Sequence, residues 1–181
     1  MANWLHKATL RYQGSEDPPI TDQANWIRNP VLPEGCDDWS WCVVDGDTVR
    51  APTTEEQAVI TAAKLAGAKA AKIREIDART GELIETGSVT INGEDLSTRQ
   101  TQQTSLLGIK ASIDVGIGTF PRALSATDGS TYQCPNLTDF IRISGMVLAF
   151  VESAKASGRA LRAQVLAATT LAEVAAVEDS R

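Results

Sequence analysis

The sequence predicts an α+β fold, with a small N-terminal antiparallel β unit, a long connecting helix and a mainly helical C-terminal domain that carries short β ribbons. All four tryptophans and five of the seven prolines lie at or before residue 52. An Ala- and Lys-rich stretch follows, and beyond it the apolar pattern changes from helical to alternating and back. We therefore expect three parts, at residues 1–52, 53–71 and 72–181.

The first predicted element is a β-strand at residues 4–12. Its residues alternate, which places one set of side chains on each face. A loop at residues 14–20 ends the strand, because Pro18 and Pro19 lack backbone donors and fix φ. The face that carries the tryptophan consists of Trp4, His6, Ala8, Leu10 and Tyr12.

A β-hairpin is predicted at residues 39–50. Asp45-Gly46 supplies the positive φ that a two-residue turn requires, between residues 39–44 and 47–50. Such a small β unit is not stable on its strands alone, so we expect its tryptophans to anchor it to itself and to the following helix. The candidate partner-binding residues are the same four side chains, Trp4, Trp26, Trp39 and Trp41.

A long helix is predicted after the β unit. Thr53 is a good N-cap, and Glu56 completes a capping box. The helix then runs from about residue 55 to residue 84, or about 45 Å. Its middle, residues 65–72, offers mainly small apolar side chains. Two interpretations follow: a connector exposed along part of its length, or a helix packed fully on the C-terminal domain.

Residues 72–109 predict a helix, a hairpin and a second helix. Helical spacing is shown by Ile73, Ile76, Leu83 and Ile84. Gly87 marks the end of the first helix, and residues 88–91 alternate before the Asn92-Gly93 turn. We expect the second helix to start at Ser97, whose hydroxyl caps it while Gln100 reaches back.

The rest of the chain predicts one more ribbon and two helical segments. Residues 122–134 alternate and fold back at Asp128-Gly129. A helix follows from about Asn136 to Ser157, with Asp139 as the partner of the Asn136 cap. A last short helix begins at Thr170, with Glu173 as its capping partner.

One apolar stripe on the predicted helix at residues 136–157 has two interpretations. It faces the core, as in most amphipathic helices of globular domains, or it lines a partner-binding groove. We predict that it faces the core. The stripe consists of Leu137, Phe140, Ile141, Ser144, Val147, Leu148 and Val151.

The order of these elements carries a family resemblance. Residues 72–109 give a helix, a ribbon with an Asn-Gly turn and a Gln-rich helix that leads into Leu-Leu-Gly, and residues 167–174 give an Ala-Thr-Thr break before a short Leu-x-Glu-Val helix. This series resembles a domain of unknown function that recurs at the C-terminal ends of bacteriophage tail-fibre, baseplate-accessory and tail-fibre-assembly proteins. The likeness covers roughly the last 110 residues. Residues 118–121 are short where many relatives carry an aromatic-rich loop.

Charge and hydropathy argue against nucleic acid and membranes as partners. The formal net charge is −6, and the 17 Lys and Arg residues are scattered rather than gathered in one stripe. No apolar run approaches the roughly 20 residues that span a bilayer, and the first four residues lack the basic start of a signal peptide. We expect the chain to stay in the cytoplasm of the cell that makes it until it is released.

No motif predicts an enzyme, a cofactor or a metal site. The chain has one histidine, His6, and no serine stands in a Gly-x-Ser-x-Gly elbow. Cys36, Cys42 and Cys134 lack Cys-x-x-Cys spacing, so we favour small half-buried or buried thiols over a metal or redox site. We predict no catalytic, cofactor-binding or metal-binding residues.

The resemblance implies a context and no chemistry. We expect a non-enzymatic structural or adaptor component of a bacteriophage tail, in the tail fibre or baseplate apparatus, that docks to other tail proteins of the fibre, baseplate or neck. The alternative is a tail-fibre assembly chaperone that is not retained in the mature virion. The expected location is the virion tail, after assembly in the host cytoplasm, and the oligomeric state within the assembly stays open.

Overall fold

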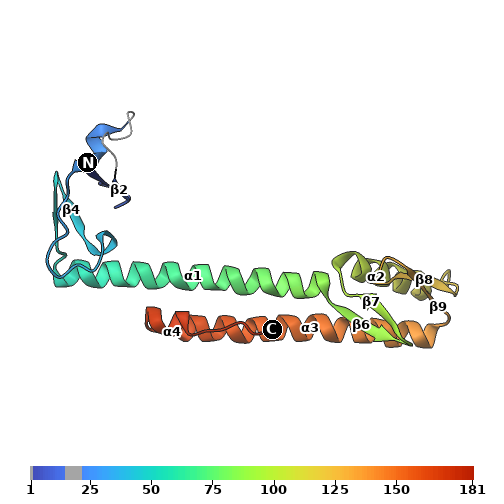
Figure 1. The fold of residues 1–181 in the computed structure, drawn as a ribbon. Coiled ribbons are helices and arrows are strands. Elements are labelled where there is room, and N and C mark those ends of the chain that lie inside the picture. The colour runs from blue at the N-terminus through green and yellow to red at the C-terminus, as the bar shows by residue number, and fades with distance from the viewer. Residues whose placement is uncertain (1, 15–21) are drawn as a thin grey trace. The chain divides into compact units, whose positions relative to one another are not determined.

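The computed structural model of the chain describes residues 2–14 and 22–181 (Figure 1). It is α+β, as predicted: small antiparallel sheets come first, the long helix α1 follows, and further helices with short hairpins between them complete the chain. The contacts between residues divide the chain into two compact units, Met1–Ala66 and Gly67–Arg181. The first unit includes the start of α1, while the boundaries at residues 1–52, 53–71 and 72–181 stay a prediction.

The first unit contains a three-stranded antiparallel sheet in the order β2-β1-β3. Its strands are β1 (Asn3–His6), β2 (Tyr12–Gly14) and β3 (Trp26–Arg28). The prediction of one strand over residues 4–12 is wrong, because the chain turns after His6, where Leu10 N donates to His6 O at 2.8 Å and Leu10 has φ +53°. Alternation alone does not separate one strand from two short strands that pair. The predicted proline loop at residues 14–20 lies outside the described residues from residue 15 on.

A second hairpin of the first unit joins β4 (Val43–Asp45) to β5 (Thr48–Arg50). The predicted turn is confirmed, with Gly46 at φ +61°. The expectation that Trp39 to Trp41 belong to the first strand is wrong, because these residues form the 3-10 helix η2 (Trp39–Trp41). Asp38 stabilises this turn by accepting a hydrogen bond from Ser40 N at 2.7 Å. Another 3-10 helix, η1 (Gln23–Asn25), precedes β3.

Helix α1 (Thr54–Thr86) is the long helix that the sequence predicts. Its capping box is confirmed: Thr53 N donates to Glu56 Oε2 at 2.8 Å, and Glu56 N donates to Thr53 Oγ1 at 3.3 Å. Arg50 binds the same carboxylate through both terminal nitrogens at 2.7 Å. The second hairpin is therefore tied to the first turn of α1.

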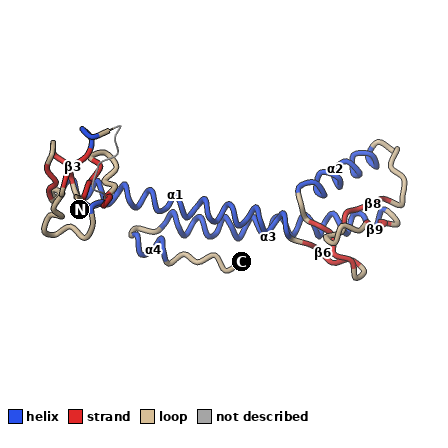
Figure 2. The backbone as a smooth tube through the Cα atoms, turned by 45° about the horizontal axis from the view of Figure 1, so that its top comes forward, coloured by secondary structure: helices blue, strands red, loops and turns tan. Residues whose placement is uncertain are grey.

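In the second unit, α3 (Leu137–Ala167) runs antiparallel to the second half of α1 (Figure 2). Lys69 Nζ donates to Leu166 O at 2.8 Å, and Gly158 lies against Thr80. The predicted end of this helix at Ser157 is wrong by ten residues. A Cβ at position 158 would lie 2.6 Å from Thr80 Oγ1, so this glycine permits close packing of two helices instead of ending one.

Two short hairpins and helix α2 (Gln100–Asp114) complete the second unit. β6 (Ser88–Ile91) pairs with β7 (Glu94–Ser97) across Asn92 and Gly93, both with positive φ, and this turn is confirmed. β8 (Arg122–Ser125) pairs with β9 (Thr131–Cys134), as predicted. The hairpins, α2 and α3 share a core of Val89, Ile91, Leu96, Leu106, Leu124, Ala126, Cys134, Phe140, Ile143 and Val147.

Helix α2 begins later than predicted. Ser97 ends β7 and is not the N-cap, and its hydroxyl accepts from Arg99 N at 3.2 Å. Glu85 Oε1 instead accepts from Gln100 N, the first residue of α2, at 3.2 Å. The Ser-x-x-Gln pattern predicts a local cap for the start of α2. The carboxylate of Glu85, fifteen residues before Gln100, caps the helix instead.

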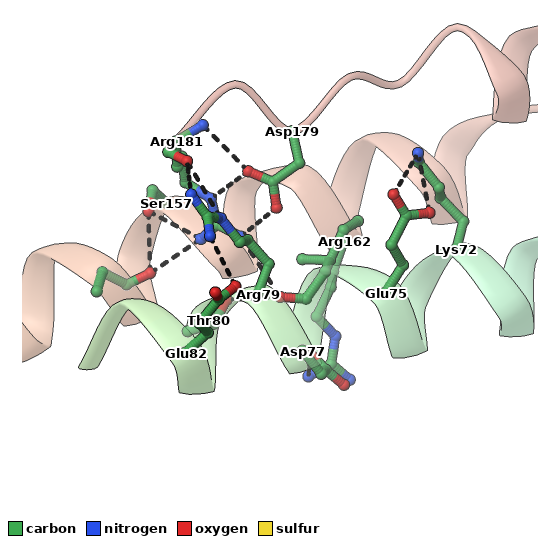
Figure 3. A network of polar contacts seen from close by, with 12 residues as sticks. Lys72, Glu75, Asp77, Arg79, Thr80, Glu82, Ser157, Arg162, Asp179 and Arg181 are labelled. Atoms are coloured by element: carbon green, nitrogen blue, oxygen red, sulfur yellow. Dashed lines mark hydrogen bonds and ion pairs between the residues drawn. The ribbon is translucent and has the colours of Figure 1, made fainter. Parts of the chain in front are cut away.

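The C-terminal segment is fixed to both long helices of the second unit (Figure 3). The short helix α4 (Leu171–Ala175) has the predicted capping box of Thr170 and Glu173. Beyond it, the Arg181 guanidinium binds Asp179 at 2.6 and 2.7 Å, Ser157 Oγ at 3.1 Å and the Ile76 carbonyl at 3.4 Å. The Arg181 guanidinium lowers the pKa of the Asp179 carboxyl below its ordinary value. One side chain thus links α1, α3 and the last residues described.

Candidate functional site

An open apolar groove lies on the second unit, lined by α2 and α3. Its cavity volume is about 580 Å³. Buried side chains, among them Leu106, Phe140 and Val147, form its floor. Large apolar side chains at its walls face solvent: Leu107 is 66% exposed, Ile141 61%, Leu148 62% and Leu137 44%. Exposed apolar side chains that gather in one concave place indicate a binding surface for another molecule.

The groove forms because α3 carries more apolar surface than the domain covers. Its buried residues Phe140, Ile143 and Val147 belong to the shared core, and Val151 is also buried. Leu137, Ile141 and Leu148 extend the same stripe around the helix, and α2 does not cover them. The prediction that the whole stripe at residues 137–151 is core is therefore wrong for these three residues. Ile141 follows Leu137 by four residues, and Leu148 follows Ile141 by seven. This helical spacing, next to the buried residues of α3, is the sequence signal of a second apolar row.

Polar groups are few in the groove. Lys110 Nζ binds Asp114 Oδ2 at 2.6 Å on the C-terminal part of α2. On α3, Ser144 Oγ is buried and has no hydrogen-bond partner among the described residues. A Cβ at Gly145 would meet no other atom within 4 Å. The site can bury apolar surface and pair with charges at one edge, and these are the properties of a peptide-binding or protein-binding groove.

The four tryptophans predicted to bind a partner all lie in the first unit, and all are half-buried. Trp39 stacks on Tyr12 with ring centroids 5.5 Å apart, and Trp41 lies under Lys64 Nζ at 3.4 Å from its ring centroid. The Trp26 and His6 rings pack edge to face with centroids 5.0 Å apart. The Arg28 guanidinium carbon lies 5.8 Å from the centroid of the Trp4 ring. The structure thus gives each of them neighbours within its own unit. Their role in docking stays a prediction.

Three carboxylates with lowered pKa values stabilise a turn and two helix starts. Hydrogen bonds from Arg50 lower the pKa of Glu56 to about 2. Ser130 lowers the pKa of Asp128 in the β8–β9 turn, and Thr169 lowers that of Glu173 at the start of α4. None of these three side chains lines the groove. Their pKa values reflect local capping contacts.

Across residues 2–14 and 22–181, no three His, Cys, Asp or Glu side chains gather where they would hold a metal ion. Within these same ranges, no helix has a segment sufficiently long and apolar to cross a bilayer.

The second unit is thus an α+β domain with a long helical pair, two hairpins and an apolar groove. Residues 67–179 match the family described as "Domain of unknown function (DUF4376)", and the chain belongs to this family. The match begins where the second unit begins, so the groove lies inside the family domain and the tryptophans lie outside it. No curated protein and no solved structure matches the chain.

Proposed function

We propose that the chain is a non-enzymatic structural or adaptor component of a bacteriophage tail, retained in the mature particle as part of the fibre or baseplate apparatus. The observation that carries the proposal is the exposed apolar groove inside the family domain. An apolar, concave surface with a polar edge is suited to hold another protein. The resemblance of residues 72–181 to domains of phage tail proteins supplies the context.

The occupant that fits the groove best is an amphipathic helix of another tail protein. Both walls are helical: residues 103–114 of α2 contribute about three turns, and residues 137–151 of α3 contribute about four. A helix that lies between two others buries apolar side chains at spacings of three and four. Because Lys110 and Asp114 are both at the edge, we expect the occupant to carry an acidic and a basic residue at one end.

Mass spectrometry of purified, salt-washed particles tests the proposed place in the virion. We expect the protein at a fixed ratio to the tail tube or sheath protein. Absence from washed particles, together with misassembled fibres when the protein is withheld, would contradict retention in the virion and would favour the assembly chaperone.

A matched pair of variants tests the groove. Leu148 and Leu166 both lie on α3 and are 62% and 61% exposed, but only Leu148 lines the groove. Leu148→Lys should weaken incorporation into particles by about 2 kcal/mol or more, or about thirtyfold, because a charge would replace an apolar contact at the interface. The Leu166→Lys variant should be incorporated into particles to the same extent as the unchanged protein. Equal incorporation of both variants would exclude the groove as the docking surface.

A further inference from the structure

The Cys36 and Cys42 thiols converge on one 3-10 turn of the first unit. Cys36 Sγ donates to the Trp41 carbonyl at 3.8 Å, and Cys42 Sγ donates to the Asp38 carbonyl at 3.6 Å. Both carbonyls belong to the same turn, since Trp41 N donates to Asp38 O at 3.1 Å. The Cys36 sulfur therefore lies beside the peptide group that joins Trp41 to Cys42. Neither cysteine is part of a disulfide in this structure.

The two thiols bond to carbonyls of the same turn, and they differ in access to solvent. Cys42 is buried and Cys36 is half-buried. Burial, followed by a hydrogen bond with the Cys36 thiol, raises the pKa of Cys42 to about 12. Asp38 raises this pKa further and Lys64 lowers it. Cys42 is thus a buried, protonated thiol, and Cys36 is the sulfur that a solute reaches first.

We propose that Cys36 and Cys42 form a reversible intramolecular disulfide by exchange with a low-molecular-weight disulfide such as oxidised glutathione. The Cys36 thiolate attacks one sulfur of the reagent, and a first glutathione thiolate leaves and takes a proton from water. Cys42 then loses its proton to solvent and attacks the Cys36 sulfur of the mixed disulfide, which releases the second glutathione. Two protein thiols are oxidised, and one reagent disulfide is reduced to two thiols.

This bond would close a short loop around the tryptophan-bearing turn. Trp39 and Trp41 lie inside residues 36–42, where they contact Tyr12 and Lys64. The strands of this unit are three or four residues long, and small units of this kind gain stability from covalent links. The disulfide would hold the two aromatic contacts in place. The disulfide requires no partner protein, and its formation is independent of any role in a phage tail.

Peptide mass spectrometry of the full chain tests the proposal. No Lys or Arg lies between Arg28 and Arg50, so trypsin leaves both cysteines in one peptide, residues 29–50. After incubation with oxidised glutathione, acid quenching and alkylation of the unfolded chain, this peptide should be lighter than its reduced form by two hydrogens. Cys134, which is fully buried in the second unit, should be alkylated throughout and serves as the internal control.

Single variants test the order of the two exchange steps, first at Cys36 and then at Cys42. In Cys42→Ser, Cys36 should accumulate one bound glutathione, while in Cys36→Ser the buried Cys42 should stay unmodified. The unfolding midpoint of the oxidised protein, followed by tryptophan fluorescence, should exceed that of the reduced protein by several degrees. Neither variant should show this difference. A wild-type protein in which glutathione stays on Cys36 while Cys42 is alkylated, or in which disulfides form only between chains, would overturn the proposal.

Discussion

Gly158 and Arg181 determine how the two long helices of the second unit meet. Gly158 leaves space that Thr80 and the Arg181 guanidinium occupy, because a Cβ there would lie 2.6 and 3.1 Å from their atoms. Arg181 then satisfies backbone carbonyls of α1 and α3 and the carboxylate of Asp179. The absence of a side chain at Gly158 thus lets α1 and α3 pack closely. The charged network of Arg181 and Asp179 lies beside this contact and links the two helices to the C-terminal segment.

We predict that Gly158→Ala destabilises the protein by about 1–3 kcal/mol, because the new methyl group displaces the Thr80 hydroxyl from its bond to Ile76 O. Urea unfolding followed by circular dichroism measures the change. The control is Gly81→Ala, also inside a long helix, where a Cβ meets nothing within 4 Å. This variant should gain about 0.5–1 kcal/mol from helix propensity. Equal effects of the two substitutions would contradict the packing role of Gly158.

The Asp179–Arg181 pair predicts acid sensitivity. The pKa of Asp179 is lowered in the folded state, so the folded chain binds fewer protons than the unfolded chain near that pKa. The stabilisation is present at neutral pH and is lost as the pH falls from about 4, the ordinary value of an unfolded Asp, through the folded pKa. Asp179→Asn should reduce stability at pH 7, and its stability difference from the unchanged protein should shrink below pH 4.

Thermal melts from pH 7 to pH 2 measure this effect. The control is Arg162→Gln, which breaks the Arg162–Asp77 pair between the same two helices. Both partners of that pair are about half exposed, so its loss should cost less than about 1 kcal/mol at pH 7. A constant difference between Asp179→Asn and the unchanged protein over the whole range would show that the carboxylate charge is not involved.

At the scale of elements, α2 depends on a residue outside itself. Its first backbone donor is satisfied by Glu85, which lies near the end of α1, and Thr98 Oγ1 donates to Ile84 O at 2.8 Å. Gln102, buried on α2, accepts from Ser125 N of β8 at 3.2 Å. The start of α2 is therefore held by contacts with α1 and β8, and its position depends on both elements.

We predict that Glu85→Ala destabilises the second unit by about 1 kcal/mol, because Gln100 N loses its acceptor. Glu85→Gln keeps a carbonyl oxygen at the same place and should restore most of the loss. Amide hydrogen exchange at residues 100–103 checks where the effect lies, and we expect faster exchange there in Glu85→Ala alone. Unchanged protection in that variant would exclude Glu85 as the cap.

At the scale of the molecule, the family domain and the second compact unit coincide. The family match covers residues 67–179 and the unit covers Gly67–Arg181. The core shared by the hairpins, α2 and α3 lies within these residues, as do the buried Ile76, Val165 and Val174. A domain of about this size buries enough surface to be stable alone.

We predict that residues 67–181 fold without the first unit. The fragment should give a single cooperative thermal transition and the helical circular dichroism of α2, α3 and the part of α1 from Gly67 to Thr86. Residues 1–66 alone should unfold at a lower temperature and less cooperatively, because their strands are short. Aggregation of the fragment of residues 67–181, or loss of its cooperative transition, would contradict the independence of the family domain.

Several elements were predictable because their signals are local. The Thr53–Glu56 and Thr170–Glu173 boxes, and the turns at Asn92-Gly93 and Asp128-Gly129, each depend on residues within about four positions of one another. The candidate site was predicted only in part. Helical spacing predicts the apolar stripe of α3, but the prediction that its outer row, Leu137, Ile141 and Leu148, lies in the core is wrong.

The sequence by itself determined the fold class, the hairpin turns and the start of α1, since backbone conformation and capping depend on neighbours along the chain. Only the tertiary structure decided that α3 continues through Gly158, that Glu85 caps α2, and that Leu148 faces solvent while Val151 is buried. Each of these depends on which other element lies alongside. Helical spacing predicts that a face is apolar, but the number of elements available to cover that face is a property of the whole domain.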